Sequence, residues 1–323
     1  MKTTVVIPNY NGLKFLEDCM ESLRAQTFRD FEVLIIDNAS SDGSVEFLRS
    51  NYPEARLIVN ETNLGFSGAV NIGIRESHSP YVLLLNNDVK ADPGFVGELT
   101  AAIERSPKIF SVASRMMQMY HPDKLDSAGD YYNLLGWAVN RGVDESPERY
   151  MSPCQTFTAC AGAAIYRKSV FEKIGYFDEM HFAYLEDIDV GYRARIYGYK
   201  NLYCPSAVVY HVGSGTSGSK YNSFKVKLSA RNNIYLNYKN QTDFQLFVNF
   251  PALALGTFVK YLFFVKKGFA NDYLEGIREG LNTRYQCRRV PYENKNFFNY
   301  LDIELKLISN TFRYVYDWIK RHA

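Results

Sequence analysis

The stretch that decides the fold is Thr3-Thr4-Val5-Val6-Ile7-Pro8-Asn9-Tyr10-Asn11-Gly12, a short apolar run that ends in polar and turn-forming residues. A run of this length bounded by turn residues is typical of a buried strand. Further apolar runs, which predict strands, follow at residues 31–36, 55–59 and 81–85. Stretches with helical spacing lie between them, at residues 13–26, 44–51 and 67–77. Alternating strands and helices predict parallel β-α-β units with right-handed crossovers.

Polar residues follow three of the predicted strands, in segments 8–12, 37–43 and 86–88. Ligands bind beyond the carboxyl ends of the strands in such sheets, so these segments are expected to line the site. Asp37 can accept a hydrogen bond from a base imide or a ribose hydroxyl, whereas Asp42 is better explained as a helix cap. The first loop is neither a phosphate loop nor a dinucleotide-binding glycine motif, which argues against kinase and hydride-transfer activities.

The second half of the chain is less regular. No sustained period extends from 110 to 150, which predicts irregular loops that shape a pocket. After it, strands are expected at residues 158–166 and 201–210, and helices at residues 169–174 and 187–197. Pro205 interrupts the last strand, and His211 follows it at the entrance to a Gly/Ser-rich loop at 213–219.

Acidic residues gather in Glu186-Asp187-Ile188-Asp189, at the start of a predicted helix, and in Asn86-Asn87-Asp88, at the end of a predicted strand. A metal-assisted transfer reaction needs one group to hold a cation against a diphosphate and another to take a proton from an acceptor. A helix dipole also favours acids in the first turn, so Glu186 and Asp189 have a structural explanation as well. The pattern predicts an enzyme.

The composition is that of a cytosolic globular protein. With 323 residues, the chain is long enough for one large domain with an appendage or for two domains. Its five cysteines are scattered, odd in number and without a CxxC pair, which predicts reduced thiols and no zinc cluster. The N-terminus enters a strand directly, without a signal-peptide pattern, so we expect the catalytic part inside the cell. No nucleic-acid partner is expected.

Charge divides the chain near residue 218. Residues 1–218 carry 20 basic and 27 acidic residues, whereas residues 219–323 carry 17 basic and 8 acidic ones. The positive second part is expected to meet an anionic surface, such as that of a membrane. A solvated basic helical face is the alternative explanation.

An aromatic and apolar run occupies residues 244–265 and is followed by Lys266-Lys267. It contains Asn249, Pro251 and Lys260, and it falls short of the roughly 20 apolar residues of a membrane span. These features favour an interfacial or re-entrant amphipathic segment, bound peripherally at the cytoplasmic face of the membrane. The alternative is a helix that packs on the catalytic domain or on the second subunit of a homodimer.

Five motifs in order resemble those of the family 2 inverting glycosyltransferases. They are Val5-Val6-Ile7-Pro8-Asn9-Tyr10-Asn11-Gly12, Asp37-Asn38-Ala39-Ser40-Ser41-Asp42-Gly43, Asn63-Leu64-Gly65, Asn86-Asn87-Asp88 and Glu186-Asp187-Ile188-Asp189. The resemblance covers about residues 3–215 and looks closest to the bacterial rhamnosyltransferase-like branch that builds cell-surface polysaccharides. It implies the α/β A-type (GT-A) fold, with a mostly parallel central sheet and a C-terminal helical extension.

The resemblance up to about residue 215, and the basic and aromatic composition after it, predict two regions of different function. Residues 1–218 would form the catalytic domain, with a nucleotide-binding half at 1–110 and an acceptor half at 111–218. Residues 219–323 would form a helical, basic region that associates with a membrane or forms a dimer.

Individual residues of the donor site can also be carried over from the resemblance. Pro8, Tyr10 and Asp37 would line the nucleoside pocket, and Gly162, within the small-residue segment 160–164, would leave room for the donor sugar. The expected nucleotide-sugar-binding residues in full are Pro8, Asn9, Tyr10, Asp37, Asn63, Asn86, Asn87 and Gly162.

Asn86-Asn87-Asp88 occupies the place of the family's DXD motif. Asp88 would therefore contact a divalent cation, Mg²⁺ or Mn²⁺, and His211 matches a histidine that completes the metal site in some relatives. Asn86 stands where the family often has Asp. This departure predicts weaker metal or ribose binding and leaves strict metal dependence open.

Asp187 matches the catalytic base of the family. It would remove the proton of the acceptor hydroxyl while that oxygen attacks the anomeric carbon opposite the leaving diphosphate, which inverts the configuration. Glu186 and Asp189 complete the predicted catalytic group. Arg193 and Arg195 would neutralise these acids or contact the diphosphate, and simple helical ion pairs are the alternative.

The leading hypothesis is transfer of L-rhamnose from dTDP-L-rhamnose onto a polyprenyl-linked glycan. Transfer of galactofuranose, glucose or an N-acetylhexosamine from a UDP-sugar remains an alternative within the same class. A sugar nucleotidyltransferase would need a Gly-rich basic first loop, which this sequence does not have. A non-catalytic sugar-binding subunit of a polysaccharide assembly complex would be consistent with Asn86 but not with intact Asp88 and Asp187.

Overall fold

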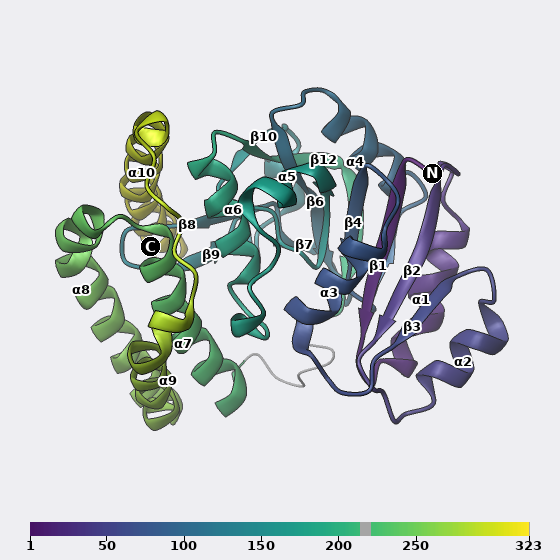
Figure 1. Ribbon diagram of the computed structural model, residues 1–323, viewed down its shortest axis with the longest axis horizontal. Helices are drawn as coiled ribbons and strands as arrows, with labels where there is room; N and C mark the ends of the chain where they lie inside the picture. The colour runs from purple at the N-terminus through teal and green to yellow at the C-terminus, as the bar shows by residue number, and fades with distance from the viewer. Residues whose placement is uncertain (214–220, 323) are drawn as a thin grey trace.

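The computed structural model describes residues 1–213 and 221–322 and places one mixed β-sheet between two layers of helices (Figure 1). The strands of this sheet are β1 Thr3–Asn9, β2 Phe31–Asp37, β3 Arg56–Val59, β4 Tyr81–Leu85, β5 Val89–Ala91, β6 Ile109–Gln118, β7 His121–Ser127, β10 Cys154–Thr156, β11 Ala163–Arg167 and β12 Lys200–His211. They follow the order β10-β12-β6-β11-β4-β1-β2-β3, with β5 beside β12 and β7 beside β6. A separate two-stranded sheet joins β8 (Asp130–Tyr132) to β9 (Ala138–Asn140).

The first half of the chain has the predicted parallel arrangement. Strands β3, β2, β1 and β4 are neighbours and run parallel. The register pairs Asn9 with Asp37, so these two residues end their strands side by side. Strand β11 runs antiparallel between β4 and β6, whereas β6 and β12 are parallel to each other. The predicted α/β class is confirmed.

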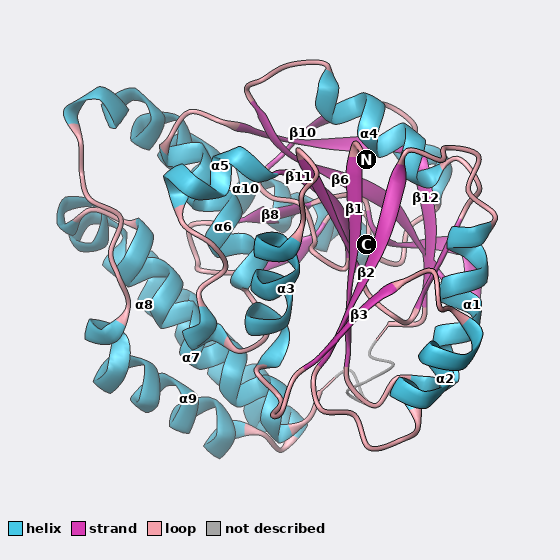
Figure 2. Ribbon diagram, turned by 45° about the vertical axis from the view of Figure 1, so that its right-hand side comes forward, coloured by secondary structure: helices cyan, strands magenta, loops and turns pink. Residues whose placement is uncertain are grey.

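Helices cover both faces of the sheet (Figure 2). They are α1 Leu13–Arg24, α2 Ser44–Asn51, α3 Gly65–Glu76, α4 Phe95–Glu104, α5 Lys168–Ile174 and α6 Glu186–Ile196. Leu16, Leu48 and Phe95 of α1, α2 and α4 belong to the core on one face. Val70 and Phe171 of α3 and α5 belong to the core on the other face. Two covered faces explain why the central strands are apolar runs rather than alternating ones.

The irregular loops expected between 110 and 150 are a wrong prediction, because β6 to β9 lie there. Strand β6 is buried along most of its length, so its side chains show no alternation of polar and apolar residues. The strand expected at 158–166 is shorter than predicted. Residues 159–162 form a loop and turn, and β11 begins only at Ala163.

Strand β12 accommodates Pro205 without ending. Its register against β6 shifts between Cys204 and Val208, which places the proline, with no N–H to donate, at an irregularity of the ladder. The strand then continues to His211. Residues 214–219 of the predicted Gly/Ser-rich loop lie outside the described residues.

Long helices follow the sheet and lie together beside α6 (Figure 1). They are α7 Ser223–Asn240, α8 Asp243–Lys267, α9 Ala270–Thr283 and α10 Phe297–His322. Helix α8 is one continuous helix of 25 residues that includes Pro251, so the re-entrant form expected for this segment is wrong. Only 11% of its most apolar stretch is buried, so α8 is not a buried core helix, and packing on a second subunit stays a prediction. Its length and composition, taken alone, are sufficient for a helix that crosses a membrane.

The polarity of α8 is reversed relative to a helix of a soluble core. Its inward side chains Gln245 and Asn249 are buried and donate to Glu304 Oε2 of α10 at 2.9 and 3.2 Å. The Trp137 indole donates to the Gly256 carbonyl at 3.1 Å. The outward side is apolar, and Phe247 on it is 80% exposed. Helix α8 therefore binds the protein through polar contacts and presents its apolar face outward.

Candidate active site

Three polar side chains connect the ends of β1, β2 and β4. Asn9 is buried and donates from Nδ2 to the Asp37 carboxylate at 2.8 Å. Its Oδ1 accepts from Asn87 Nδ2 at 2.6 Å. The other Asp37 oxygen accepts from the Ser40 backbone N–H at 2.8 Å. The structure thus brings Asn9, Asp37 and Asn87 together at the strand ends where the sequence predicts the nucleotide pocket.

His211 lies between two carboxylates. Its Nε2 is 3.3 Å from Asp88 Oδ1, and its Nδ1 is 2.8 Å from Asp126 Oδ2. Burial alone would lower the pKa of His211, but the hydrogen bonds to Asp126 and Asp88 outweigh it and raise the pKa to about 10. Asp126 was not predicted from the sequence, since no motif marks it within the segment expected to be irregular.

Asp88 and His211 fit a divalent cation. The ladder fixes their backbones, because His211 pairs with Val89 of β5 and the Val212 N–H donates to the Asp88 carbonyl at 3.1 Å. Octahedral Mg²⁺ has bonds of about 2.0–2.1 Å, which places neighbouring ligand atoms about 3 Å apart. The observed separation of 3.3 Å is close to this value. The mixed oxygen and nitrogen donors favour Mn²⁺ over Mg²⁺, which prefers oxygen.

Asp187 and Glu186 lie in the first turn of α6, where the helix dipole favours negative charge. One Asp187 carboxylate oxygen accepts from the Ile188 N–H at 2.7 Å. Burial raises the pKa of Asp187 to about 6, a value that suits a general base near neutral pH. Burial and the neighbouring charge of Asp187 raise the pKa of Glu186 to about 8. The protonated form of Glu186 is therefore favoured beside an ionised Asp187, and its predicted place in the catalytic group stays a prediction.

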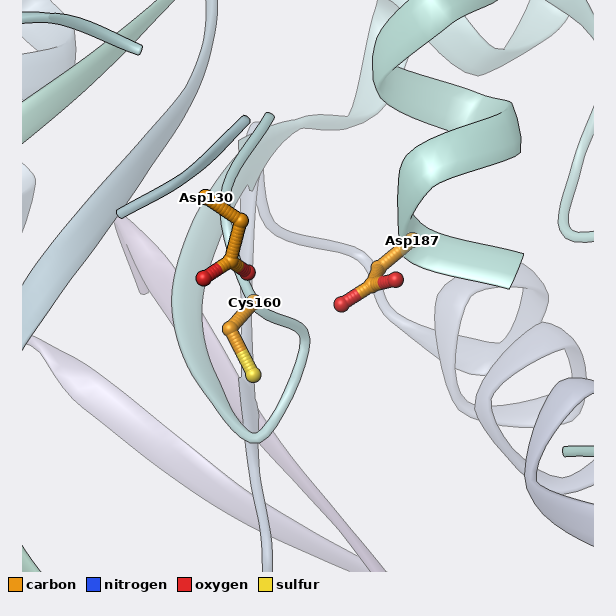
Figure 3. Close-up of side chains that lie close together, drawn as sticks. All are labelled: Asp130, Cys160 and Asp187. Atoms are coloured by element: carbon orange, nitrogen blue, oxygen red, sulfur yellow. The ribbon is translucent and has the colours of Figure 1, made fainter. Parts of the chain in front are cut away.

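A compact group surrounds the predicted base. Asp130 of β8, Cys160 and Asp187 have side-chain atoms that all lie within 4.8 Å of one another (Figure 3). Burial, and then the charge of Asp187, raise the pKa of Asp130 well above its usual value, and burial raises the pKa of the Cys160 thiol. A metal-bound cysteine is a thiolate. Raised pKa values favour the protonated, neutral forms of Asp130 and Cys160. The two residues therefore fit better as neutral neighbours of the base than as ligands of a hard cation.

The loop that precedes Asp187 has a strained backbone. Phe182, Tyr184 and Leu185 have φ values of 60°, 74° and 66°, which cost non-glycine residues about 1–3 kcal/mol each. Asn232 of α7 is fully buried, and its Nδ2 donates to three carbonyls within residues 181–184 at 2.8–2.9 Å. These bonds hold the loop in place. Asn232 was not predicted, because it lies in an ordinary helical pattern far from the motifs.

The same loop contacts the nucleotide half of the sheet. The Ser67 N–H donates to the Phe182 carbonyl at 3.1 Å. Gly65 has φ 72°, and a side chain there would overlap Phe182, so only glycine fits. Asn63 Oδ1 accepts from the Gly65 N–H at 2.9 Å, which explains Asn63 as a turn residue.

Asp189 faces away from Asp187, and its predicted place in the catalytic group requires correction. Its carboxylate is fully buried and pairs with Arg193 at 2.8 Å and with Lys239 at 3.0 Å. Burial alone would raise the pKa of Asp189, but these charges outweigh it and hold the pKa well below its usual value. We assign Asp189 to the attachment of α7. Arg195 donates to the carbonyls of residues 156 and 157, which differs from the predicted diphosphate contact.

The other predicted donor-site residues lie at the same edge of the sheet. Pro8 is half-buried, and Tyr10 is exposed. The Asn86 N–H donates to the Gly162 carbonyl at 2.8 Å, and a side chain at Gly162 would crowd the Asn86 amide. Their roles in donor binding stay predictions.

A cavity of about 640 Å³ lies elsewhere, between the start of α8 and the start of α10. Phe244, Val248, Tyr300 and Leu301 are among its lining residues, and none of the predicted site residues lines it. The polar chemistry described above lies at the strand ends instead. The cavity therefore belongs to the C-terminal helices.

The comparisons with known proteins agree with this geometry. The model of the family described as glycosyl transferase family 2 matches residues 4–175, more than half of the chain. The chain belongs to this family. An N-acetylglucosaminyl-diphospho-decaprenol L-rhamnosyltransferase of Mycobacterium tuberculosis is 28% identical over 243 residues, which cover 66% of this chain and 77% of the relative. The amylovoran biosynthesis glycosyltransferase AmsB of Erwinia amylovora is 26% identical and covers 87% of this glycosyltransferase and 97% of its own length.

Solved structures confirm the A-type glycosyltransferase fold. GalNAc-T7 with UDP, GalNAc and Mn²⁺ has a TM-score of 0.58 at 16% identity, over 73% of this chain and 47% of that one. The mannosyltransferase PcManGT of Pyrobaculum calidifontis, in complex with GDP-Man and Mn²⁺, has a TM-score of 0.53 at 14% identity, over 98% and 87%. The predictions of family, fold and glycosyltransferase activity are confirmed.

Proposed function

We propose that the protein is an inverting glycosyltransferase that moves L-rhamnose from dTDP-L-rhamnose onto a polyprenyl-linked glycan in cell-surface polysaccharide synthesis. One observation carries the catalytic part of the proposal. The Asn86 N–H binds the Gly162 carbonyl, and the N–H of the adjacent Ala161 binds the Asp187 carboxylate. The base and the DXD-like segment are thus joined through two consecutive residues. The name of the Mycobacterium tuberculosis relative supports the sugar and the lipid acceptor.

Asp187 performs the proton transfer in this proposal. Its carboxylate accepts the proton of the acceptor hydroxyl as that oxygen forms a bond to the anomeric carbon. The bond between the anomeric carbon and the diphosphate oxygen breaks, and the nucleoside diphosphate leaves with the bonding electrons. One displacement from the opposite face inverts the anomeric configuration. Glu186, which is protonated beside the ionised base, adds no competing charge.

The donor is held at the strand ends. Asp37, positioned by Asn9, accepts from the imide N–H of thymine or uracil, and Pro8 and Tyr10 border the nucleoside. Asp88 and His211 would hold Mn²⁺ or Mg²⁺ beside the diphosphate. When bound, this ion would neutralise the negative charge that develops on the leaving diphosphate. The Mn²⁺ in two structural neighbours supports this assignment.

The domain division follows the same logic. Residues 1–110 supply the nucleotide contacts, residues 111–218 supply the base, and residues 219–323 attach the enzyme peripherally to the cytoplasmic face of the membrane. The reversed polarity of α8 supports this attachment, as do the exposed aromatic side chains Phe247, Phe258 and Phe312. Basic residues beside this surface, such as Lys266 and Lys267, would be attracted by anionic lipids.

A vesicle flotation assay tests the attachment. We expect the protein to float with phosphatidylglycerol vesicles at low salt, and the double variant Phe247→Ser/Phe258→Ser to lose this binding. The matched control Tyr120→Ser removes an exposed aromatic side chain between β6 and β7, outside the C-terminal helices. A wild-type protein that ignores the vesicles and is dimeric in solution would assign the apolar face to a homodimer instead.

A donor panel tests the activity. Release of nucleoside diphosphate is measured with dTDP-rhamnose, UDP-galactofuranose, UDP-glucose and UDP-N-acetylglucosamine, each with a polyprenyl-diphosphate-linked sugar and with Mn²⁺, Mg²⁺ or EDTA. We expect release from dTDP-rhamnose that is lost in Asp187→Asn. Release from a UDP-sugar alone would replace rhamnose as the donor sugar. No release from any donor, together with no binding of any nucleotide, would contradict the transferase proposal and favour a non-catalytic subunit.

A further inference from the structure

We propose that Asp126 is a positioning residue of the metal site, which holds the His211 ring by its Nδ1 so that Nε2 faces the cation beside Asp88. This inference rests on the metal site proposed above and adds to it a residue from the acceptor half of the chain. Three separate elements then build one site: the end of β4, the end of β12 and strand β7.

The geometry of the imidazole ring carries the proposal. The distance of 2.8 Å between His211 Nδ1 and Asp126 Oδ2 is that of a strong charge-assisted hydrogen bond. The opposite ring nitrogen points to Asp88 at 3.3 Å. Because the two nitrogens lie on opposite sides of the ring, a rotation or flip of the ring would break both contacts. Asp126 therefore fixes the direction in which Nε2 is presented.

The hydrogen bond also selects the form of the ring that can bind a metal. When a cation displaces the Nε2 proton, a carboxylate at Nδ1 keeps the proton on that nitrogen, so the Nε2 lone pair is the one that faces the cation. Histidine ligands of metals usually donate their second N–H to such a carboxylate or to a carbonyl, and the partner raises the basicity of the ligand. Asp126 has the position and the charge for this role.

Asp126 also explains how the site can work with Asn86. An amide at residue 86 brings no negative charge to the DXD-like segment, so Asp88 is its single carboxylate. Asp126 adds a second carboxylate behind His211 and is about three-quarters buried. Solvent screens a half-buried charge less than an exposed one. The charge missing from Asn86 is thus supplied from another strand.

In a purely structural role, Asp126 would only hold β7 against β12 through its hydrogen bond to His211. The two roles differ in what they predict. If the role is structural, replacing Asp126 changes the free energy of unfolding and leaves metal affinity unchanged. If Asp126 is a positioning residue, its replacement changes metal affinity while the protein stays folded. The replacements Asp126→Ala and Asp126→Glu distinguish them. Asp123→Ala, an exposed aspartate on the same strand, is the matched control.

The experiment measures Mn²⁺ binding directly. Purified protein is saturated with dTDP or UDP and titrated with Mn²⁺, and free Mn²⁺ is followed by its electron paramagnetic resonance signal. Pulsed measurements on the bound ion report the nitrogen coupling from His211. We expect Asp126→Ala to weaken Mn²⁺ binding by about 10–100-fold and to diminish the nitrogen coupling. Asp126→Glu should recover part of the affinity, and Asp123→Ala should match wild type.

Two results would overturn the inference. The first is an Asp126→Ala protein that is folded, as judged by thermal unfolding without metal, and binds Mn²⁺ within twofold of wild type with unchanged nitrogen coupling. The second is a wild-type protein that binds no Mn²⁺ with either nucleotide, because Asp126 then has no metal ligand to orient. The second result leaves the transferase proposal standing if the donor panel shows turnover in EDTA.

Discussion

Burial controls the protonation of Asp187, with a pKa raised to about 6. A general base acts only when it is deprotonated, so the rate must follow the ionised fraction of this carboxylate. We expect kcat/KM to fall about tenfold for each pH unit below about 6 and to level off above it. The measurement is the pH profile of nucleoside diphosphate release with saturating metal. A profile that stays flat down to about pH 4, the ordinary range of an aspartate, would contradict a buried base.

Asp189 has the opposite shift and a stabilising role. Its pKa is held below the usual value by Arg193 and Lys239, so its contribution to stability is complete above the ordinary aspartate pKa of about 3.9 and is lost as the pH falls. We expect Asp189→Asn to lower the free energy of unfolding by about 3–5 kcal/mol, because buried Arg193 loses its carboxylate partner and Lys239 keeps only Asp178. Urea denaturation at neutral pH measures it. Asp302→Asn, which removes an exposed carboxylate near Arg195, should change it by less than about 0.5 kcal/mol.

The two acids show what the sequence could predict about the site. The motif located Asp187 at the start of a helix, as the structure has it. Residues two apart on a helix point in nearly opposite directions, so Asp187 and Asp189 could not share one site. Asp126 and Asn232 were missed for a different reason. Their roles depend on contacts between segments distant in sequence, and spacing along one segment does not report such contacts.

A close backbone approach attaches α8 to the β8–β9 hairpin. A side chain at Gly256 would overlap the Leu135 carbonyl, and Trp137 donates to the Gly256 carbonyl. In an exposed helix Gly→Ala stabilises by about 1 kcal/mol. We expect Gly256→Ala to destabilise instead, by about 1–3 kcal/mol, because the clash involves main-chain atoms. Thermal unfolding measures the change, with exposed Ala254→Ser on the same helix as control. An increase in melting temperature would contradict the close approach.

The elements differ in how well their sequences predicted them. Tyr81–Leu85 and Ser44–Asn51 were predicted at their observed bounds, because apolar runs between turn residues mark them clearly. Strand β6 was missed because both of its faces are covered and neighbouring strands satisfy its backbone. The exposed apolar face of α8 is what an interfacial segment would present, but the sequence also left packing on the catalytic domain or a second subunit open, since periodicity identifies a face but not what covers it.

Ligand binding should stabilise the whole catalytic domain, because the proposed nucleotide and metal contacts come from strands on both sides of β11. A ligand present at about 100 times its dissociation constant adds about 2.7 kcal/mol to the free energy of unfolding. We expect dTDP or UDP with Mn²⁺ to raise the melting temperature, EDTA to reduce this rise, and GDP to have a smaller effect. Differential scanning fluorimetry measures all three. An equal rise with all nucleotides would contradict base recognition by Asp37.

Helix α7 determines where the C-terminal parts of related enzymes could be exchanged. Its Asn232 binds the loop before Asp187, and its Lys239 and Asn240 bind the Asp189 carboxylate. A chimera joined before α7 would import a helix whose side chains do not match this loop, and it would lose the alignment of the base. A chimera joined at Thr242, between α7 and α8, keeps every one of these bonds. The helices after Thr242 are thus a replaceable module, but α7 is inherited with the catalytic domain.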